Sequence, residues 1–206
     1  MLIGVDFDNT IVSYDALFHR IALEQGLVPP DVPASKVSVR DHLRRIDKED
    51  LWTEMQGYVY GARMDEAAMY PGVLDFLRWA RQKSIVTVIV SHKTQHPFLG
   101  PKYDLHGAAR AWIAHHLRDE DGALVEATGV FFELTKEAKL ARIAALGCSH
   151  FIDDLPEILL ADGFPERTEP ILFDPENHHA GVPDLVRVRQ WKDLKGYFEG
   201  AWAAIR

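Results

Sequence analysis

Two aspartates, Asp6 and Asp8, stand two positions apart in the sequence GVDFDNT, immediately after the apolar residues 2–5. Two carboxylates this close repel each other, and burying them removes favourable hydration. Ser91 follows another apolar run, IVTVIV, and the acidic pair Asp153 and Asp154 follows residues 149–152. A metal, a reaction at a phosphate group or a binding partner must therefore offset the cost of bringing them together.

Two lysines complete a set of groups that suits phosphoryl transfer. Lys136 and Lys139 stand ahead of the acidic pair, in KEAKLARIAALGCSHFIDD. Carboxylate oxygens are the ligands that Mg²⁺ prefers, and one aspartate can attack phosphorus while a second moves the proton. A serine hydroxyl and an ammonium group can hold the charged phosphoryl oxygens. The residue types thus predict a metal-assisted reaction at a phosphate group.

Short apolar segments predict the strands that would bring these residues together. They occupy residues 2–5, 85–90, 129–132, 149–152, 170–173 and 185–188. Helical spacing of apolar residues between them predicts helices over residues 73–82, 105–117, 136–146, 156–161 and 190–205. Alternating strands and helices favour an α/β fold, a Rossmann-like parallel sheet sandwiched by helices, with the site at the carboxyl ends of its strands.

A long segment after the first strand does not alternate in this way. Helical patterns fall at residues 17–25, 37–47 and 51–62, and no strand pattern accompanies them. We interpret residues 15–70 as a small helical cap inserted into a core domain of residues 1–14 and 71–206. Trp52, Tyr58 and Tyr60 are expected to form the aromatic core of this cap. A closed cap would favour a small substrate over a folded protein.

The four motifs in order resemble the haloacid dehalogenase superfamily of phosphotransferases. Its first motif, Asp-x-Asp-x-Thr after an apolar strand, is matched by GVDFDNT, and its second, a Ser or Thr that ends a strand, by Ser91 in IVSHKT. Its third is a lysine ahead of an acidic strand, and its fourth is an acidic pair, matched by FIDDLPE. The match extends from residue 6 to residue 154, and the cap lies at the family's first insertion point.

The resemblance implies a role for each matched residue. Asp6 would be the nucleophile and Asp8 the general acid and base. Mg²⁺ would be bound by Asp6, the backbone carbonyl of Asp8 and the acidic pair, with Asp154 as the direct ligand and Asp153 in support. The family's spacing favours Lys139 as the phosphate-binding lysine, with Lys136 as the alternative. We further expect Asn9, Thr10, His92 and Lys93 to contact the substrate, although a solvated loop explains His92 and Lys93 equally well.

The leading hypothesis is a Mg²⁺-dependent phosphatase that acts on a small phosphorylated metabolite such as a sugar phosphate or a nucleotide monophosphate. Relatives that act on C–Cl or C–P bonds typically lack an aspartate at the position of Asp8.

A phosphomutase would use the same residues, and a regulatory protein on the same fold is a further alternative. A receiver domain would carry its acidic pair after the first strand. A calcium loop starting at Asp6 would need glycine and glutamate where Ile11 and Leu17 stand.

Composition limits the remaining possibilities. A net charge of −8 makes the chain a poor candidate for broad contact with nucleic-acid phosphates. The single cysteine, Cys148, forms no disulfide within the chain and is expected to be a buried, inert thiol. No secretory leader and no apolar run of membrane-spanning length is apparent, so we expect a cytoplasmic protein.

Overall fold

The structure is a computed structural model that describes residues 1–182 and 185–204, and its contacts divide the chain into two compact units. The first unit contains Met1–Ile11, Met69–His92 and Leu117–Arg206, and the second contains Val12–Ala68 and Lys93–His116. Each unit combines segments that are distant in the sequence.

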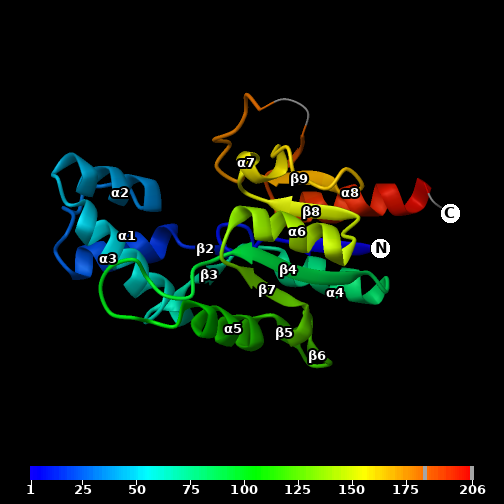
Figure 1. Cartoon of the computed structure of the whole chain (residues 1–206), viewed down its shortest axis with the longest axis horizontal. Coiled ribbons are helices and arrows are strands. Elements are labelled where there is room, and N and C mark those ends of the chain that lie inside the picture. Colours follow the sequence, from blue (N-terminus) through cyan, green and yellow to red (C-terminus); the bar gives the residue numbers. More distant parts are fainter. Residues whose placement is uncertain (183–184, 205–206) are drawn as a thin grey trace. The chain divides into compact units, whose positions relative to one another are not determined.

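The first unit is built on a six-stranded parallel sheet (Figure 1). Its strands lie in the order β10-β9-β8-β1-β4-β7. Their bounds are β1 (Leu2–Val5), β4 (Val86–His92), β7 (Val130–Glu133), β8 (His150–Asp153), β9 (Glu169–Phe173) and β10 (Val186–Val188). The predicted α/β fold and its six strands are confirmed, with strand ends that differ from the predicted ones by at most two residues.

The central position of β1 determines which strand ends meet. Val5, its last residue, pairs with Ile89 of β4 on one side and with Ile152 of β8 on the other. The amide of Asp6 then donates to the carbonyl oxygen of Ile152 at 2.8 Å. Because all three strands run in the same direction, the residues that follow them emerge at one edge of the sheet.

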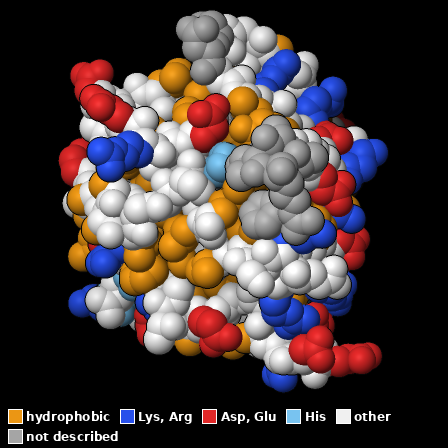
Figure 2. All heavy atoms as spheres, turned by 90° about the vertical axis from the view of Figure 1, so that its right-hand side faces the viewer, with side chains coloured by type: hydrophobic (Ala, Val, Ile, Leu, Met, Phe, Trp, Pro, Cys, Tyr) orange, Lys and Arg blue, Asp and Glu red, His pale blue; other side chains and the backbone are white. Residues whose placement is uncertain are grey.

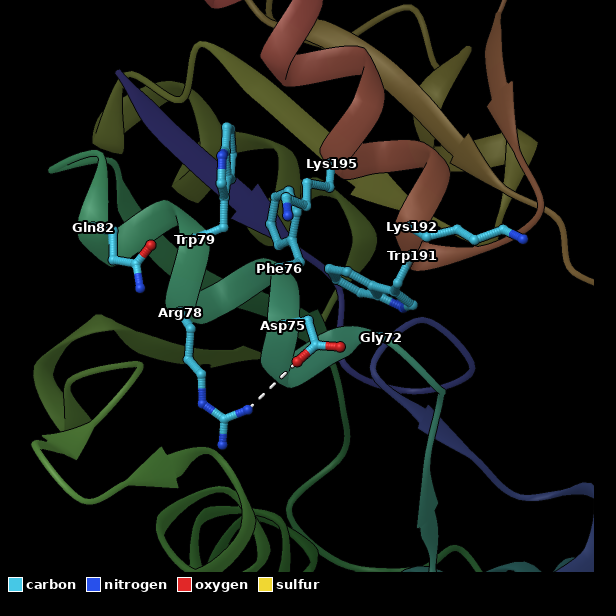
Figure 3. Close-up of a pocket in the computed structure, with 9 residues that line it drawn as sticks. All are labelled: Gly72, Asp75, Phe76, Arg78, Trp79, Gln82, Trp191, Lys192 and Lys195. Carbon is cyan, nitrogen blue, oxygen red and sulfur yellow. Dashed lines mark hydrogen bonds and ion pairs between the residues drawn. The ribbon is translucent and has the colours of Figure 1, made fainter.

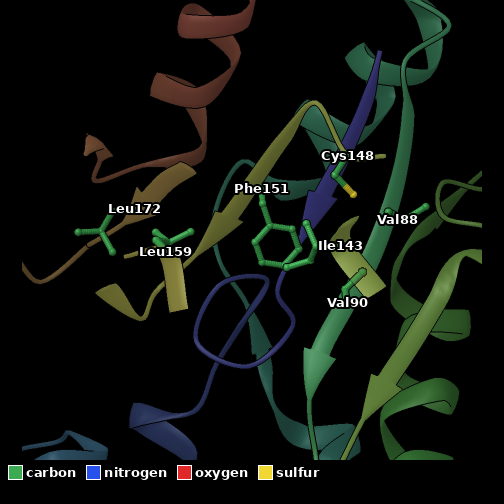
Figure 4. Close-up of a cluster of buried hydrophobic side chains, with 7 residues drawn as sticks. All are labelled: Val88, Val90, Ile143, Cys148, Phe151, Leu159 and Leu172. Atoms are coloured by element: carbon green, nitrogen blue, oxygen red, sulfur yellow. The ribbon is translucent and has the colours of Figure 1, made fainter. Parts of the chain in front are cut away.

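Helices cover both faces of this sheet. On one face, α6 (Lys136–Leu146) and α7 (Pro156–Leu159) enclose a cluster of buried apolar side chains from helices and strands (Figure 4). Val88 and Val90 point into this cluster from alternate positions of β4, as the two-residue period of a strand requires. Cys148 is buried in the same cluster, which confirms its predicted burial.

The opposite face is covered by α4 (Val73–Gln82) and α8 (Trp191–Ala204), which pack against each other through aromatic rings. The helices over residues 73–82 and 136–146 match the predicted bounds, whereas α7 ends two residues before the predicted 161. The predicted end of the last helix at residue 205 lies outside the described residues.

The second unit is a group of helices. They are α1 (Asp15–Glu24), α2 (Lys36–Arg45), α3 (Glu49–Tyr60), the 3₁₀ turn η1 (Met64–Glu66) and α5 (Leu105–His116). Their core is aromatic: the ring of Phe18 lies 5.0 Å from Trp52, and Tyr14 lies 4.8 Å from Tyr60 in an edge-on arrangement. Trp52 is buried, in agreement with its predicted place in an aromatic core.

The contacts place Lys93–His116 in the helical unit, whereas the predicted boundaries left this segment in the core domain. Gly57 of α3 and Gly61, directly after the end of that helix, explain the association. A Cβ on Gly57 would lie 2.6 Å from Pro97, and one on Gly61 would collide with Tyr103, so the loop packs directly on the helix backbone. On α5, the indole nitrogen of Trp112 donates to the carbonyl of Ala67 at 3.0 Å.

Several short elements were not predicted from the sequence. Two-residue strands form the pairs β2 (Val12–Ser13) with β3 (Ala68–Met69) and β5 (Arg118–Asp119) with β6 (Gly122–Ala123), and a 3₁₀ turn, η2, spans Ala127–Gly129. The prediction that residues 15–70 contain no strand is therefore wrong at β3. Two residues are too few to show an alternating pattern.

The surface carries charges of both signs. Figure 2 shows one face, on which basic and acidic side chains are interspersed around the margin and apolar side chains lie between them. Among the described residues, every helix is too short or too polar to cross a membrane.

Candidate active site

A small cavity of about 80 Å³ lies at the carboxyl ends of β1, β4 and β8. Most of the side chains that line it were predicted from the sequence, and all of them belong to the first unit. The lining residues are Asp6, Asp8, Asn9, Ser91, His92, Lys139, Asp154, Leu155 and Ile158. The structure thus brings both predicted carboxylate pairs to the same edge of the sheet.

Lys139 joins the two carboxylate pairs. Its Nζ atom lies 2.6 Å from Oδ1 of Asp6 and 2.6 Å from Oδ2 of Asp153, and its side chain is almost fully buried. Helix α6 holds the lysine in this place because Thr135 caps its N-terminus by accepting from the amide of Ala138. Gly147, at a φ of 66°, ends the helix in the left-handed conformation that glycine adopts without strain.

Lys136, the predicted alternative, lies away from the cavity. Its Nζ atom is 3.6 Å from Glu157 in a solvent-exposed ion pair. The two lysines are three positions apart, but Lys136 is the first residue of α6 and is exposed, whereas Lys139 is buried against the sheet edge. Of the two lysines, only Lys139 lines the cavity.

The acidic pair after β8 has two different environments. Asp153 is fully buried; its Oδ1 accepts from the amide of Leu155 at 3.0 Å, while its Oδ2 contacts Lys139. Asp154 lines the cavity directly. Carboxylate oxygens of Asp6, Asp153 and Asp154 all lie within 4.8 Å of one another.

The electrostatics of this cluster favour an additional cation. Burial is the main cause that raises the pKa of Asp6 to about 7; Lys139 opposes this increase, and Asp153 and Asp8 add to it. Burial also opposes the charge on Lys139, but Asp153 and Asp6 raise its pKa above the ordinary value. One buried ammonium therefore does not compensate the carboxylates around it, and their hard oxygen donors fit a divalent ion such as Mg²⁺.

The turn after β1 presents Asp8 to the cavity. Asn9 has a left-handed backbone, with a φ of 57°, and the amide of Ile11 closes the turn on the carbonyl of Phe7 at 3.1 Å. Asn9 lines the cavity, whereas Thr10 is completely buried and does not. Among the described residues, the Thr10 hydroxyl has no hydrogen-bond partner.

The residues at the end of β4 also separate into two groups. Ser91 is buried and lines the cavity, and the Nε2 atom of His92 lies 3.1 Å from the carbonyl of Leu134. Lys93 belongs to the helical unit, where its Nζ atom lies 4.8 Å from the centre of the Tyr60 ring. There, Nε2 of His106 lies 2.8 Å from the Lys93 carbonyl oxygen, so His106 has a structural contact within this unit.

Leu155 and Ile158 form an apolar part of the lining that the sequence analysis did not include. Their position directly after the acidic pair is the only sequence signal for them. Pro156 at the first position of α7 turns the chain here, which places Leu155 and Ile158 beside the carboxylates.

The fold and these motifs identify the class of protein. A family model for haloacid dehalogenase-like hydrolases matches residues 3–161, and the chain belongs to this family. A comparison with curated proteins found no match.

Solved structures with the same fold cover nearly the whole chain at low sequence identity. A haloacid dehalogenase-like family hydrolase from Xanthomonas campestris has a TM-score of 0.55 and 14% identity, over 100% of this chain and 98% of that one. An L-2-haloacid dehalogenase has a TM-score of 0.56 and 12% identity, over 96% and 98%. A β-phosphoglucomutase from a hyperthermophilic Pyrococcus strain has a TM-score of 0.54 and 12% identity, over 94% of each chain. These similarities establish a common fold among proteins of different activity.

Proposed function

We propose that the protein is a Mg²⁺-dependent hydrolase of small phosphomonoesters that works through an aspartyl-phosphate intermediate. The observation that carries this proposal is the buried cluster at the sheet edge. There Asp6 contacts Lys139, shares a possible cation position with Asp153 and Asp154, and lines one cavity together with Asp8. A nucleophile, a proton carrier and positive charge for a phosphate are thus available at one place.

In the first step, a carboxylate oxygen of Asp6 attacks the phosphorus atom. A bond forms between that oxygen and phosphorus, and the bond from phosphorus to the ester oxygen breaks. Asp8, protonated at this stage, donates its proton to the departing oxygen, which leaves as an alcohol. The Ser91 hydroxyl and the Lys139 ammonium group hold the phosphoryl oxygens, on which negative charge accumulates.

The second step releases phosphate. Asp8, now a carboxylate, takes a proton from a water molecule whose oxygen attacks the phosphorus atom. The bond between phosphorus and Asp6 breaks, and the Asp6 carboxylate is restored. Because the same side chain gives a proton in one step and takes one in the other, the enzyme returns to its starting protonation state.

The metal would be held by Asp6 and Asp154, with Asp153 in support and the Asp8 backbone carbonyl as a further oxygen donor. When bound, Mg²⁺ supplies positive charge that reduces repulsion between the carboxylates and the phosphate. The buried network orients the protein ligands: Lys139 and the Leu155 amide fix both oxygens of Asp153. Because both of its oxygens are held, Asp153 would keep a fixed position beside the metal.

A specific observation favours phosphate over halide as the group that is displaced. Asp8 lies in the cavity beside Asp6. A halide ion leaves carbon without needing a proton, whereas an ester oxygen leaves far more easily when it is protonated. A carboxylate in this position can protonate the leaving oxygen of a phosphate ester, a role that the departure of a halide does not require.

The test is phosphate release from a panel of sugar phosphates, nucleotide monophosphates and other small phosphomonoesters in the presence of Mg²⁺. Wild type would be compared with Asp6→Asn, Asp8→Asn and the matched pair Lys139→Met and Lys136→Met. We expect wild type and Lys136→Met to hydrolyse at least one compound. In the other three variants, kcat/KM for that compound should fall by at least about 100-fold.

Failure of folded, Mg²⁺-binding wild type to release phosphate from any compound would contradict the proposal. Conversion of one sugar phosphate into an isomer under those conditions would instead identify a phosphomutase. Full activity of Asp8→Asn would exclude the proton transfer assigned to Asp8.

A further inference from the structure

Trp191 connects the C-terminal helix to the turn that carries the proposed catalytic residues. It is the first residue of α8 and has no solvent exposure. Its ring packs against Phe76 of α4 at 5.2 Å (Figure 3). It also packs against Phe173 of β9 at 6.0 Å. Its indole nitrogen donates to the carbonyl oxygen of Thr10 at 3.0 Å. Trp191 lies beyond residues 3–161, which the family model matches.

The Thr10 carbonyl depends on a partner inside the protein. Thr10 is completely buried, so water does not reach this residue. A buried backbone carbonyl without a hydrogen bond is costly, and the chain would rearrange to satisfy it. Other backbone hydrogen bonds also restrain the turn, among them those from the Ile11 amide to the Phe7 carbonyl and from the Tyr70 amide to the Ile11 carbonyl at 2.9 Å. Trp191 supplies the restraint from the helix side.

We propose that Trp191 is a positioning residue, whose indole N–H fixes the turn from Asp6 to Thr10 and thereby aims Asp8 at the cavity. This inference rests on the proposed phosphatase function. Trp191 does not contact the substrate; it acts through the backbone of Thr10, two residues after Asp8. Because rates depend steeply on the placement of the reacting groups, a small displacement of this turn lowers the rate of the chemical step.

Trp79 offers a matched control in the same aromatic layer. It lies on α4 and packs against Phe76 at 5.7 Å (Figure 3). It also packs against Phe198 at 6.4 Å and is buried like Trp191. Among the described residues, its indole nitrogen has no hydrogen-bond partner. Replacing Trp79 by phenylalanine therefore removes the same atoms from the same layer without removing a contact to the turn.

The first measurement compares Trp191→Phe with Trp79→Phe in phosphate release with Mg²⁺, using a compound that wild type hydrolyses. We expect Trp191→Phe to lower kcat about tenfold, with KM changed less than about twofold. Trp79→Phe should change neither by more than about twofold. A loss of kcat of the same size in both variants, in parallel with their thermal stability, would overturn the proposal in favour of simple packing.

The second measurement does not depend on activity. Hydrogen exchange of the metal-free protein, followed by mass spectrometry of peptides that cover residues 5–12, reports on the turn directly. The Ile11 amide should exchange about tenfold faster in Trp191→Phe than in wild type, and at the wild-type rate in Trp79→Phe. Equal exchange in all three proteins would refute the positioning role.

The two measurements separate the two proposals. If wild type hydrolyses no phosphomonoester, the proposed function fails, while the exchange comparison still decides whether Trp191 restrains the turn. If Trp191→Phe does not fold, site-specific incorporation of 3-benzothienylalanine at position 191 keeps the bicyclic ring and replaces the N–H by sulfur. The same tenfold changes are then expected, and their absence would count against the proposal in the same way.

Discussion

Replacing Lys139 by methionine tests the buried charge network most directly. The lysine Nζ atom lies 2.6 Å from each of two carboxylates, and all three side chains are nearly inaccessible to solvent. Methionine fills a similar volume but leaves Asp6 and Asp153 without their shared counter-charge. Loss of one partner from a buried ionic network costs about 3–5 kcal/mol. For a chain of this length, that corresponds to a fall of roughly 6–20 °C in Tm.

The assay is thermal and urea unfolding followed by circular dichroism at pH 8 without added metal. Lys136→Met is the control, because it removes a lysine from the same helix whose ion pair with Glu157 is exposed and contributes little. The double variant Lys139→Met/Asp153→Asn should be more stable than Lys139→Met alone, since it removes one of the stranded carboxylates.

The pH dependence provides the sign of the effect. Burial raises the pKa of Asp6 in the folded state. Such a carboxylate destabilises the folded protein increasingly as the pH rises above the pKa that the group has in the unfolded chain. The loss in Lys139→Met should therefore be larger at pH 8 than at pH 5. A stability at pH 8 within about 1 kcal/mol of wild type, equal to that of Lys136→Met, would refute the idea that these buried groups are charged.

Three further predictions concern metal binding, packing and the thiol. Saturating Mg²⁺ should raise the Tm by about 5–10 °C at pH 8 and by less at pH 5.5, because Asp6, with a pKa of about 7, holds a proton that competes with the metal; an equal rise in Asp6→Asn would contradict this. Gly4→Ala should cost about 1–3 kcal/mol in urea unfolding, since its Cβ would lie 2.5 Å from the Phe151 ring; Gly163→Ala, with ordinary spacing, is the control. Cys148, buried and with a pKa raised by burial to about 11, should react with a thiol reagent at pH 8 only after unfolding; rapid labelling of the native protein would disprove its burial.

The sequence predicted those parts of the site that follow apolar strands. The run before Ser91 is apolar and rich in β-branched residues, and shorter segments with apolar residues precede Asp6 and Asp153, so the strand ends could be located within two residues. Because the strands were expected to pair in parallel, the residues that follow them were expected to meet at one edge of the sheet. Lys139 could be preferred over Lys136 from the family's spacing, and the capped helix α6 explains why only one of them faces the cavity.

Other features have no local signal. The association of Pro97 and Tyr103 with α3 depends on the absence of side chains at Gly57 and Gly61, which a sequence pattern does not reveal as a contact. The hydrogen bond from Trp191 to Thr10 joins residues 181 positions apart and depends on how α8 packs against the sheet. Thr10 matched a motif, yet whether its side chain faced the cavity or the interior depended on the left-handed turn at Asn9.

The central position of β1 in the sheet affects the order in which the strands can pair during synthesis. β1 is synthesised before both of its neighbours, and its partners are β4, which begins at Val86, and β8, which begins at His150. A ribosome that has released only β1 and β4 exposes one side of β1 as an unpaired edge, which is a template for association with other chains. Asp6, as the first residue after β1, remains without Asp153 and Lys139 until the last third of the chain emerges. The pairing of β1 with β8 and the contact of Asp6 with Lys139 therefore form only late in synthesis.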